Sequence, residues 1–156
     1  MSDNNNKQID ATTRRAEAQV AMEDDKHKVA KQLKAKERGK RREEAMRAME
    51  SLGRVVSDYK QKNGSIPPES HVDGIIKSLE GQLRLGNLRY RAQWIAFDSP
   101  PDTILAYARK NYRSLFSRPG VIVLRFDGRV EWMDKASFDK LIAGQQTPME
   151  LEMTSK

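Results

Sequence analysis

The sequence predicts an α+β fold in which a long N-terminal helix packs on a small antiparallel sheet of three to four strands, with a second helix and a short C-terminal helix. Two patterns carry this prediction. Apolar residues recur at helical spacing over residues 45–59, and the turn pair Asp127-Gly128 joins two β-favouring runs over residues 121–133. Because the helical patterns come first and the strands follow, we expect the sheet to be a meander covered by the long helix.

Composition indicates that part of the chain builds no core. Only 37% of the 156 residues are hydrophobic and 33% are charged, with a net charge of +7, which is a poor balance for a globular domain of this length. Residues 1–44 hold 12 Lys or Arg against 9 Asp or Glu, and most of their apolar residues are alanine. We therefore divide the chain into a charged, partly ordered helical extension (1–44), an α+β domain (45–144) and a flexible tail (145–156).

Residues 9–42 are predicted to be helical because they contain no proline, no glycine before Gly39, and many Ala, Glu, Lys, Gln and Arg residues. The apolar stripe of this helix is thin and rests mainly on Met22, Val29 and Leu33. A helix that is charged nearly all round is either a solvated extension or one strand of a weak coiled coil. Insertion into a membrane is disfavoured, since the stripe has no Trp or Phe.

The next segment of the chain is predicted to form the helical face that packs on the domain. Its apolar residues fall at steps of three and four: Ala45, Met49, Leu52, Val56 and Tyr59. We expect the helix to end at Asn63-Gly64, because Gly64 suits a left-handed cap and the Pro67-Pro68 pair prevents continuation. A second helix is predicted over residues 73–85, and Gly86 should end it.

Strands are predicted over residues 90–97 and 103–108, separated by the Pro100-Pro101 turn, and a polar loop over residues 111–119. The hairpin 121–133 supplies two more strands. Asp134 should cap a final helix over residues 135–143, whose apolar residues can cover a sheet face. Residues 145–156 are expected to form a loose tail.

The hydrophobic pattern also predicts the register of the hairpin. A two-residue loop at Asp127-Gly128 would mix charged and apolar residues on both faces of the sheet. A three-residue loop over residues 126–128, with Gly128 in the left-handed region, sorts them. One face then carries Ile122, Leu124, Val130 and Trp132, and the other carries Arg125, Arg129 and Glu131.

The motifs of the common enzyme classes are missing from the sequence. The chain has no cysteine, and its two histidines, His27 and His71, are too few for a zinc site. Four aspartates near the predicted sheet loops could gather as acid and base or as calcium ligands: Asp98, Asp102, Asp127 and Asp134. Each has a local structural role open to it, in a turn or as a helix cap. We therefore assign no catalytic, cofactor-binding or metal-binding residue, and calcium stays the one cofactor alternative.

Basic residues interleaved with aromatic ones indicate a second alternative, binding of single-stranded nucleic acid by backbone attraction and base stacking. The basic residues are Arg84, Arg89, Arg91, Arg109, Lys110, Arg113 and Arg118. The aromatic residues are Tyr90, Trp94, Tyr107 and Tyr112. The same residues can equally be the polar faces and the core of an ordinary sheet.

Three segments carry a family resemblance. A helix ending in Tyr59 is followed by Asn63-Gly64 and Pro67-Pro68, a strand-forming segment spans residues 99–107, and the Asp-Gly hairpin spans residues 121–132. In this order they resemble the soluble domain of bacterial pseudopilins of type II secretion and type IV pilus-like systems, especially the planctomycete-type large prepilin group. Ser117 and Arg129 stand where that hairpin has histidines, and residues 1–44 contain neither a prepilin-peptidase site nor an apolar membrane helix.

The resemblance implies a long helix packed on a small antiparallel sheet, and a role in assembly instead of catalysis. We therefore expect a non-enzymatic structural or interaction protein, without a small-molecule substrate, that binds a protein partner or associates with itself through the long helix. The alternative is a basic accessory protein that binds nucleic acid. No apolar run reaches the ~20 residues of a spanning helix, so the chain as written is expected in the cytoplasm, or at the cell envelope if it is a true pseudopilin relative.

Overall fold

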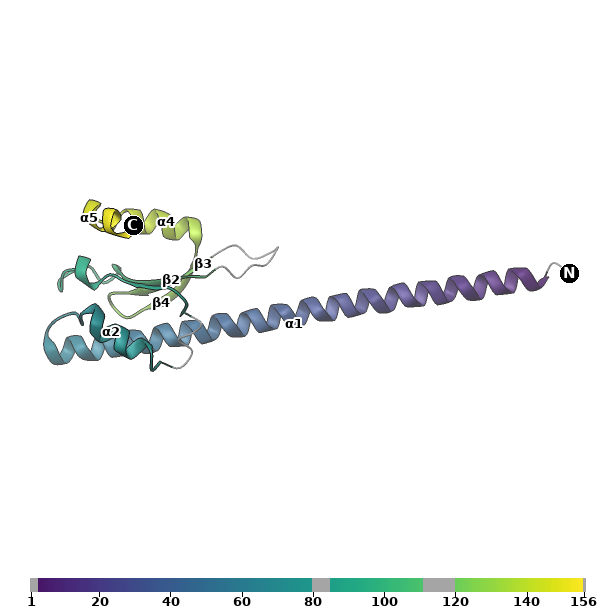
Figure 1. Cartoon of the computed structure of the whole chain (residues 1–156), viewed down its shortest axis with the longest axis horizontal. Coiled ribbons are helices and arrows are strands. Elements are labelled where there is room, and N and C mark those ends of the chain that lie inside the picture. Colours follow the sequence, from purple (N-terminus) through teal and green to yellow (C-terminus); the bar gives the residue numbers. More distant parts are fainter. Residues whose placement is uncertain (1–2, 80–84, 111–119, 156) are drawn as a thin grey trace. The chain divides into compact units, whose positions relative to one another are not determined.

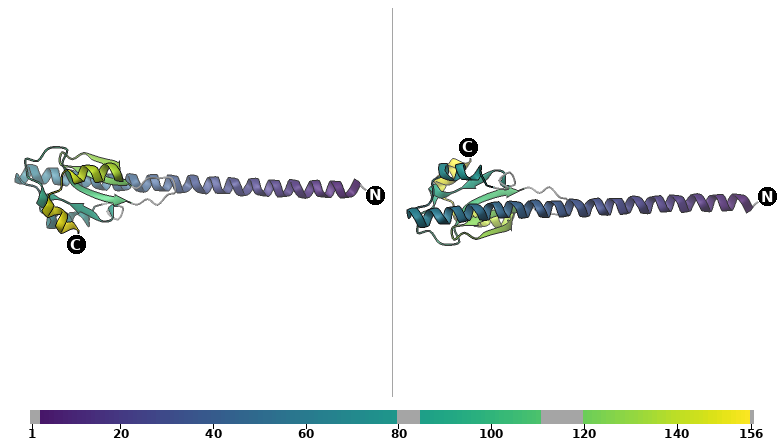
Figure 2. Two further views of the ribbon diagram at one scale, coloured as in Figure 1. Left: turned by 90° about the horizontal axis from the view of Figure 1, so that it is seen from above. Right: turned by 90° about the horizontal axis from the view of Figure 1, so that it is seen from below.

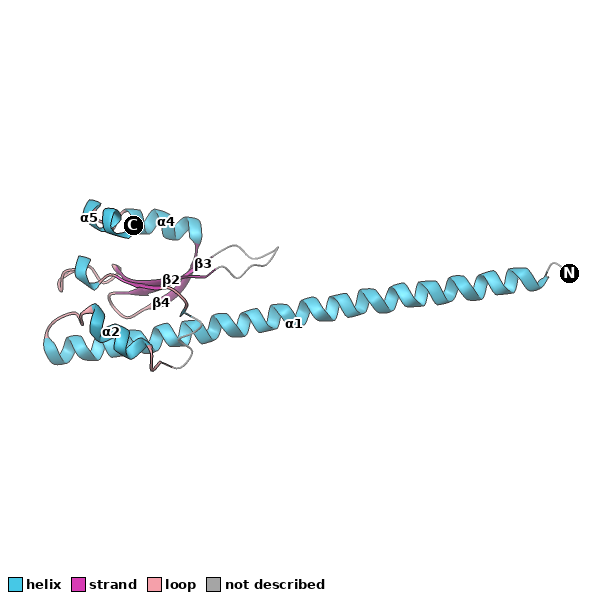
Figure 3. Cartoon of the chain, in the orientation of Figure 1, coloured by secondary structure: helices cyan, strands magenta, loops and turns pink. Residues whose placement is uncertain are grey.

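The computed structural model describes residues 3–79, 85–110 and 120–155, with backbone alone for residues 3–10 and Lys110. It has the predicted α+β fold: a long N-terminal helix, one four-stranded antiparallel sheet, and short helices that include a C-terminal one (Figures 1 and 3). The chain divides into two compact units, Met1–Lys40 and Arg41–Lys156.

Helix α1 runs without interruption over Asp3–Asn63. It ends where the sequence predicts: Gly64 has a φ of 64°, and its amide donates a hydrogen bond of 2.9 Å to the carbonyl of Lys60. The predicted buried face is confirmed for Ala45, Met49, Leu52 and Val56, whereas Tyr59 near the end of the helix is only half-buried. Within the unit Arg41–Lys156 the side chains of α1 that belong to the core are Ala45, Ala48, Met49, Leu52 and Val56.

The sheet is a meander with the strand order β1-β2-β3-β4, every neighbouring pair antiparallel. Its strands are β1 (Leu88–Tyr90), β2 (Ile104–Lys110), β3 (Gly120–Arg125) and β4 (Val130–Asp134). The strand predicted over 103–108 is thus confirmed as β2. The predicted loop over 111–119 lies outside the described residues.

The hairpin has the predicted three-residue loop. Ile122 pairs with Trp132 and Leu124 with Val130. The Arg125 amide donates to the Arg129 carbonyl at 2.8 Å, so residues 126–128 form the loop, and Gly128 has a φ of 91°. The apolar pattern therefore determined the register correctly, because a slip of one residue would expose the whole buried set.

Helices cover the sheet on both faces (Figures 1 and 2). The C-terminal part of α1 packs on the face that holds Ile122, Leu124, Val130 and Trp132. Helix α4 (Lys135–Ala143) packs on the other face, where Phe138 and Ile142 join a second core cluster. That cluster also contains Ile104, Tyr107, Val121 and Val123.

The polar face predicted for the hairpin is confined to its loop end. Arg125 and Glu131, which were predicted to share this face, form an ion pair there. Arg129 bonds to Asp127 within the loop, with 2.6 Å between Nε and Oδ2. Further from the loop the same face is apolar, and Phe138 of α4 is buried against it.

The strand predicted over residues 90–97 was wrong. The chain leaves the sheet after Tyr90: Arg91 has φ −108° and ψ 14°, and a 3₁₀ helix, η1, spans Ala92–Trp94. The Arg91 side chain turns into the interior, where it is 3% exposed. The aromatic residues of this segment favour a strand, in which side chains alternate between the two faces of the sheet. The backbone instead turns out of the sheet at Arg91, and the guanidinium is buried in the interior.

Two further boundaries needed correction. The predicted helix 73–85 begins earlier, as α2 (Glu69–Ile76), with Pro68 as its N-cap residue; residues 80–84 lie outside the described part. The predicted loose tail contains helix α5 (Pro148–Thr154), whose Thr147 hydroxyl accepts from the Glu150 amide at 3.2 Å. A buried side chain on α5, described below, fastens this helix to the domain.

Gly120 is required by its neighbour in the sheet. A methyl group there would overlap the ring of Trp132, which also lies 4.5 Å from the Arg42 guanidinium. We expect Gly120→Ala to lower the free energy of unfolding by about 1–3 kcal/mol, because the rigid ring must move. Urea denaturation measures this. Gly74→Ala, where nothing lies within 4 Å, is the control and should be neutral or stabilising; equal losses in both variants would refute the steric explanation.

Asp134 caps α4 as predicted. Its pKa lies below the usual 3.8, mainly because its carboxylate accepts from the Ser137 hydroxyl at 2.6 Å and the Ser137 amide at 3.0 Å. A carboxylate whose pKa is lowered by folding stabilises the protein above its unfolded pKa, and this contribution is lost as pH falls through the folded pKa. The melting temperature of Asp134→Asn should therefore lie below that of the parent above pH 5, and the gap should close below about pH 4. A gap independent of pH would contradict this.

Candidate functional site

The strongest candidate site is an exposed apolar stripe on the N-terminal part of α1. Every residue from 11 to 37 is exposed. Met22, Val29 and Leu33 are 62%, 54% and 62% exposed. At 3.6 residues per turn these three and Ala18 share one face of the helix, while Val20 lies on the opposite face. Large aliphatic side chains at this spacing are typical of a helix that packs on another helix.

Charge along this part of α1 is segregated by sign. Residues 16–25 carry four acidic side chains and no basic one: Glu17, Glu23, Asp24 and Asp25. Residues 26–42 carry nine basic side chains and one acidic, Glu37. An even mixture of charges would make the two ends of the stripe alike. In this chain the N-terminal half of the stripe is surrounded by acidic side chains and the C-terminal half by basic side chains. We call residues 18–33, with the acidic and basic side chains of this segment, the stripe surface.

The four candidate aspartates are occupied locally or exposed. Asp127 accepts from the amide and the guanidinium of Arg129, and Asp134 caps α4. Asp98 and Asp102 are both exposed in turns. Among the residues that the structure describes, no group of three or more His, Asp or Glu side chains is placed to hold a metal ion.

Some of the basic and aromatic residues that were predicted to form a binding surface are buried in the fold. Arg91 and Tyr107 are buried, at 3% and 6% exposure, and Tyr107 packs its ring 4.8 Å from that of Phe138. Tyr90 is half-buried and donates from its hydroxyl to the Pro67 carbonyl at 2.8 Å. Arg89 and Arg109 are exposed. Trp94 is half-buried in η1. Arg84, Tyr112, Arg113 and Arg118 lie outside the described residues, as does the Lys110 side chain.

Sequence reasoning missed the buried ion pair between Arg91 and Glu150. Arg91 Nε lies 2.6 Å from Oε1 of Glu150, and Nη2 lies 2.9 Å from Oε2. Arg91 also donates to the carbonyls of Ile104 and Gln145, at 2.6 and 3.1 Å. Glu150 is 1% exposed. Because every guanidinium contact is internal, the pair holds α5 against the sheet and offers no surface to a ligand.

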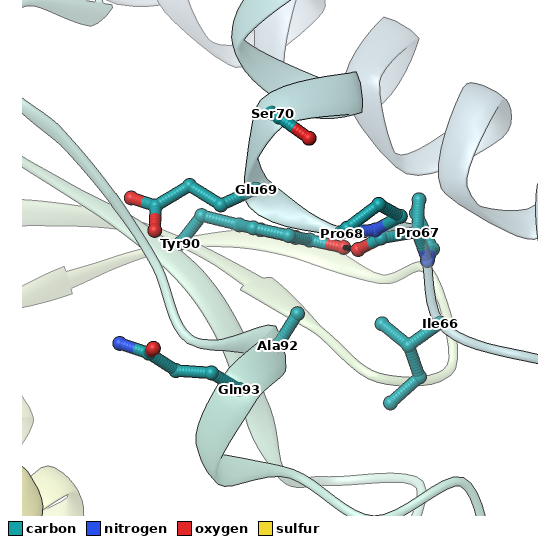
Figure 4. A pocket seen from close by; sticks show the side chains of 8 residues that line it. All are labelled: Ile66, Pro67, Pro68, Glu69, Ser70, Tyr90, Ala92 and Gln93. Carbon is teal, nitrogen blue, oxygen red and sulfur yellow. Dashed lines mark hydrogen bonds between the residues drawn. The ribbon is translucent and has the colours of Figure 1, made fainter.

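A pocket of about 420 Å³ lies between the loop after α1, the start of α2 and η1 (Figure 4). Eight residues line it: Ile66, Pro67, Pro68, Glu69, Ser70, Tyr90, Ala92 and Gln93. Figure 4 shows Glu69 and Gln93 extending toward the same side of the pocket, away from Ile66. Burial is the main cause that raises the pKa of Tyr90, and nearby Tyr59 adds to it. The Tyr90 hydroxyl is therefore protonated at neutral pH and donates its hydrogen bond to the Pro67 carbonyl.

The described helices include none that is both long and apolar enough to span a membrane. The fold and the stripe together define an α+β protein with an exposed, charge-patterned helical surface. Comparison with known protein families, curated sequences and solved structures gives no match.

Proposed function

We propose that this protein is a non-enzymatic structural or interaction protein that binds another protein through the stripe surface of α1. The observation that carries the proposal is the exposure of Met22, Val29 and Leu33, each more than half exposed on one helical face. An isolated helix without a packed face is only marginally stable in water. Burial of this face by a partner would remove apolar surface from water at roughly 25 cal/mol per Å².

The proposal extends to a pseudopilin-like head domain acting in a secretion or pilus-like assembly. Its support is architectural: the segments that resemble pseudopilins pack against one another, with the Asp-Gly hairpin seated on the C-terminal part of α1. The helix end at Asn63 and the Pro67-Pro68 loop also occur in the order that the resemblance implies. The charged N-terminal part of α1 would then serve for partner binding instead of membrane insertion.

The proposal is tested by photo-crosslinking of the full chain in the cells that produce it, from a crosslinking residue at position 26 beside the stripe. The test variant is Met22→Gln, Val29→Gln and Leu33→Gln. Its matched control changes the opposite face: Val20→Gln, His27→Gln and Lys31→Gln. We expect a specific protein to be crosslinked in the parent and the control and to be lost in the stripe variant.

Two results would count against the proposal. Crosslinking that survives in the stripe variant, or is absent from the parent, overturns the role of the stripe. A specific partner that belongs to no secretion or pilus-like assembly overturns the pseudopilin-like role but keeps the interaction role. At concentrations where the chain is a monomer, the melting temperature of each variant should match that of the parent, because the changed residues are exposed in the single chain.

Nucleic-acid binding stays the second candidate, favoured by the nine basic side chains of residues 26–42. A helix that neutralises phosphates releases counterions, so log affinity falls linearly with log salt concentration. If this function is correct, fluorescence anisotropy with a single-stranded oligonucleotide should give a slope of about −0.7 for each phosphate contact. A slope near zero would remove this function.

A further inference from the structure

We propose that the partner of the stripe surface is a second copy of this chain, paired antiparallel to the first over residues 18–33. The inference rests on the proposed function, that the stripe binds protein. It adds the identity of the partner, the direction of the pairing and the residues that meet. Three observations carry it: the segregated charge, the positions of small and large residues in the stripe, and the charges that border it.

The charge blocks favour an antiparallel pair over a parallel one. In a parallel pair in register, the acidic residues 16–25 lie beside the same acidic residues of the second copy, and the basic residues 26–42 lie beside basic ones. In an antiparallel pair centred between residues 25 and 26, the acidic block of each copy lies beside the basic block of the other. Neighbouring helices in such a pair are about 8–10 Å apart, close to the Debye length of about 8 Å at physiological ionic strength.

The same centre aligns the apolar residues. Met22 of one copy lies level with Val29 of the second copy, and Ala18 lies level with the second copy's Leu33. Small and large side chains thus face each other along the stripe and fill the space between two helices evenly. A parallel pair would instead place Ala18 beside Ala18, which leaves a gap, and Leu33 beside Leu33.

Charges that border the stripe complete the arrangement. Lys28 and Asp25 lie on one flank of the stripe, and Glu23 and Lys26 lie on the other flank. An antiparallel pair brings Lys28 of one copy near Asp25 of the second copy on the first flank. On the second flank it brings Glu23 near the second copy's Lys26. Each flank therefore holds two positive and two negative charges.

Disulfide trapping tests the direction, and the absence of native cysteine makes every crosslink attributable. Ala18→Cys and Leu33→Cys are introduced separately into the full chain, and the two variants are studied alone and as an equimolar mixture under mild oxidation. In the antiparallel pair the thiol introduced at position 18 meets the thiol introduced at position 33 of the second copy, so only the mixture should form a disulfide dimer. Two copies of the Ala18→Cys variant would hold their thiols about 22 Å apart along the axis, at ~1.5 Å per residue. This separation is far beyond the ~7 Å that a disulfide spans between Cα atoms.

A control pair on the opposite face, Val20→Cys mixed with Lys31→Cys, lies at matching levels and should give no dimer. Mass spectrometry of the linked peptides identifies the residues joined. Disulfide dimers in the single variants would indicate a parallel pair, and equal dimer yields in the control pair would indicate random collision; either result overturns the inference. No dimer in the mixture overturns it as well. If the photo-crosslink to another protein nevertheless persists, only the self-pairing has failed and the proposed function stands.

Discussion

Glu150→Ala should destabilise the domain by about 3–5 kcal/mol, because it leaves the Arg91 guanidinium buried without its carboxylate. Glu150 accepts from two guanidinium nitrogens, at 2.6 and 2.9 Å, and both side chains are nearly inaccessible to solvent. An unpaired charge in such a place cannot recover its lost hydration. Chemical denaturation followed by circular dichroism measures the loss as a reduced free energy of unfolding.

Two variants separate the ion pair from a general effect on helix α5. Glu152 lies on the same helix but is exposed, so Glu152→Ala should change stability by at most about 0.5 kcal/mol. The double change Arg91→Met and Glu150→Leu removes both charges and should recover much of the loss, since apolar residues of similar size often replace a buried pair without cost. A loss below about 1 kcal/mol in Glu150→Ala would show that the guanidinium finds water or another acceptor.

The second large effect is expected from Leu52→Ala, which should cost about 2–5 kcal/mol by opening a cavity between α1 and the sheet. Leu52 is fully buried and belongs to the same core cluster as Leu124 and Ile122. Alanine preserves the helical backbone, so the loss in free energy of unfolding reports the packing of α1 on the sheet. Urea denaturation of the full chain is the measurement.

Val29→Ala is the matched control on the same helix. Val29 is 54% exposed, so its truncation should change the stability of the monomer by at most about 0.5 kcal/mol. If Leu52→Ala and Val29→Ala had equal effects, the C-terminal part of α1 would contribute no more to the core than its N-terminal part. That result would contradict the packing described above.

The elements that could be predicted from the sequence are those with a strong local pattern. The end of α1 follows from Gly64, a glycine that is soon followed by two prolines in the sequence and that has a left-handed φ in the structure. The hairpin register follows from alternation, because one slip would reverse every side chain. The cap at Asp134 likewise needs only the three residues that follow it.

The elements that could not be predicted depend on contacts distant in sequence. The strand expected after Tyr90 is replaced because Arg91 turns inward to a glutamate that lies 59 residues further along the chain. Nothing near Glu150 in the sequence distinguishes it from the exposed Glu152, so α5 was expected to be loose. The apolar stripe on α1 could be predicted from the spacing of its residues. Spacing alone does not tell whether such a stripe is buried, and the structure shows that it is exposed.

The Arg91–Glu150 pair also has a consequence for the order of folding. Arg91 and Glu150 are 59 residues apart in the sequence, so contacts between neighbouring strands can form before the Arg91 guanidinium meets its carboxylate. Contacts between residues far apart in sequence form slowly because a long loop must close first. We therefore expect the sheet and α1 to assemble as an earlier, weaker unit, which α5 closes in the last step of folding.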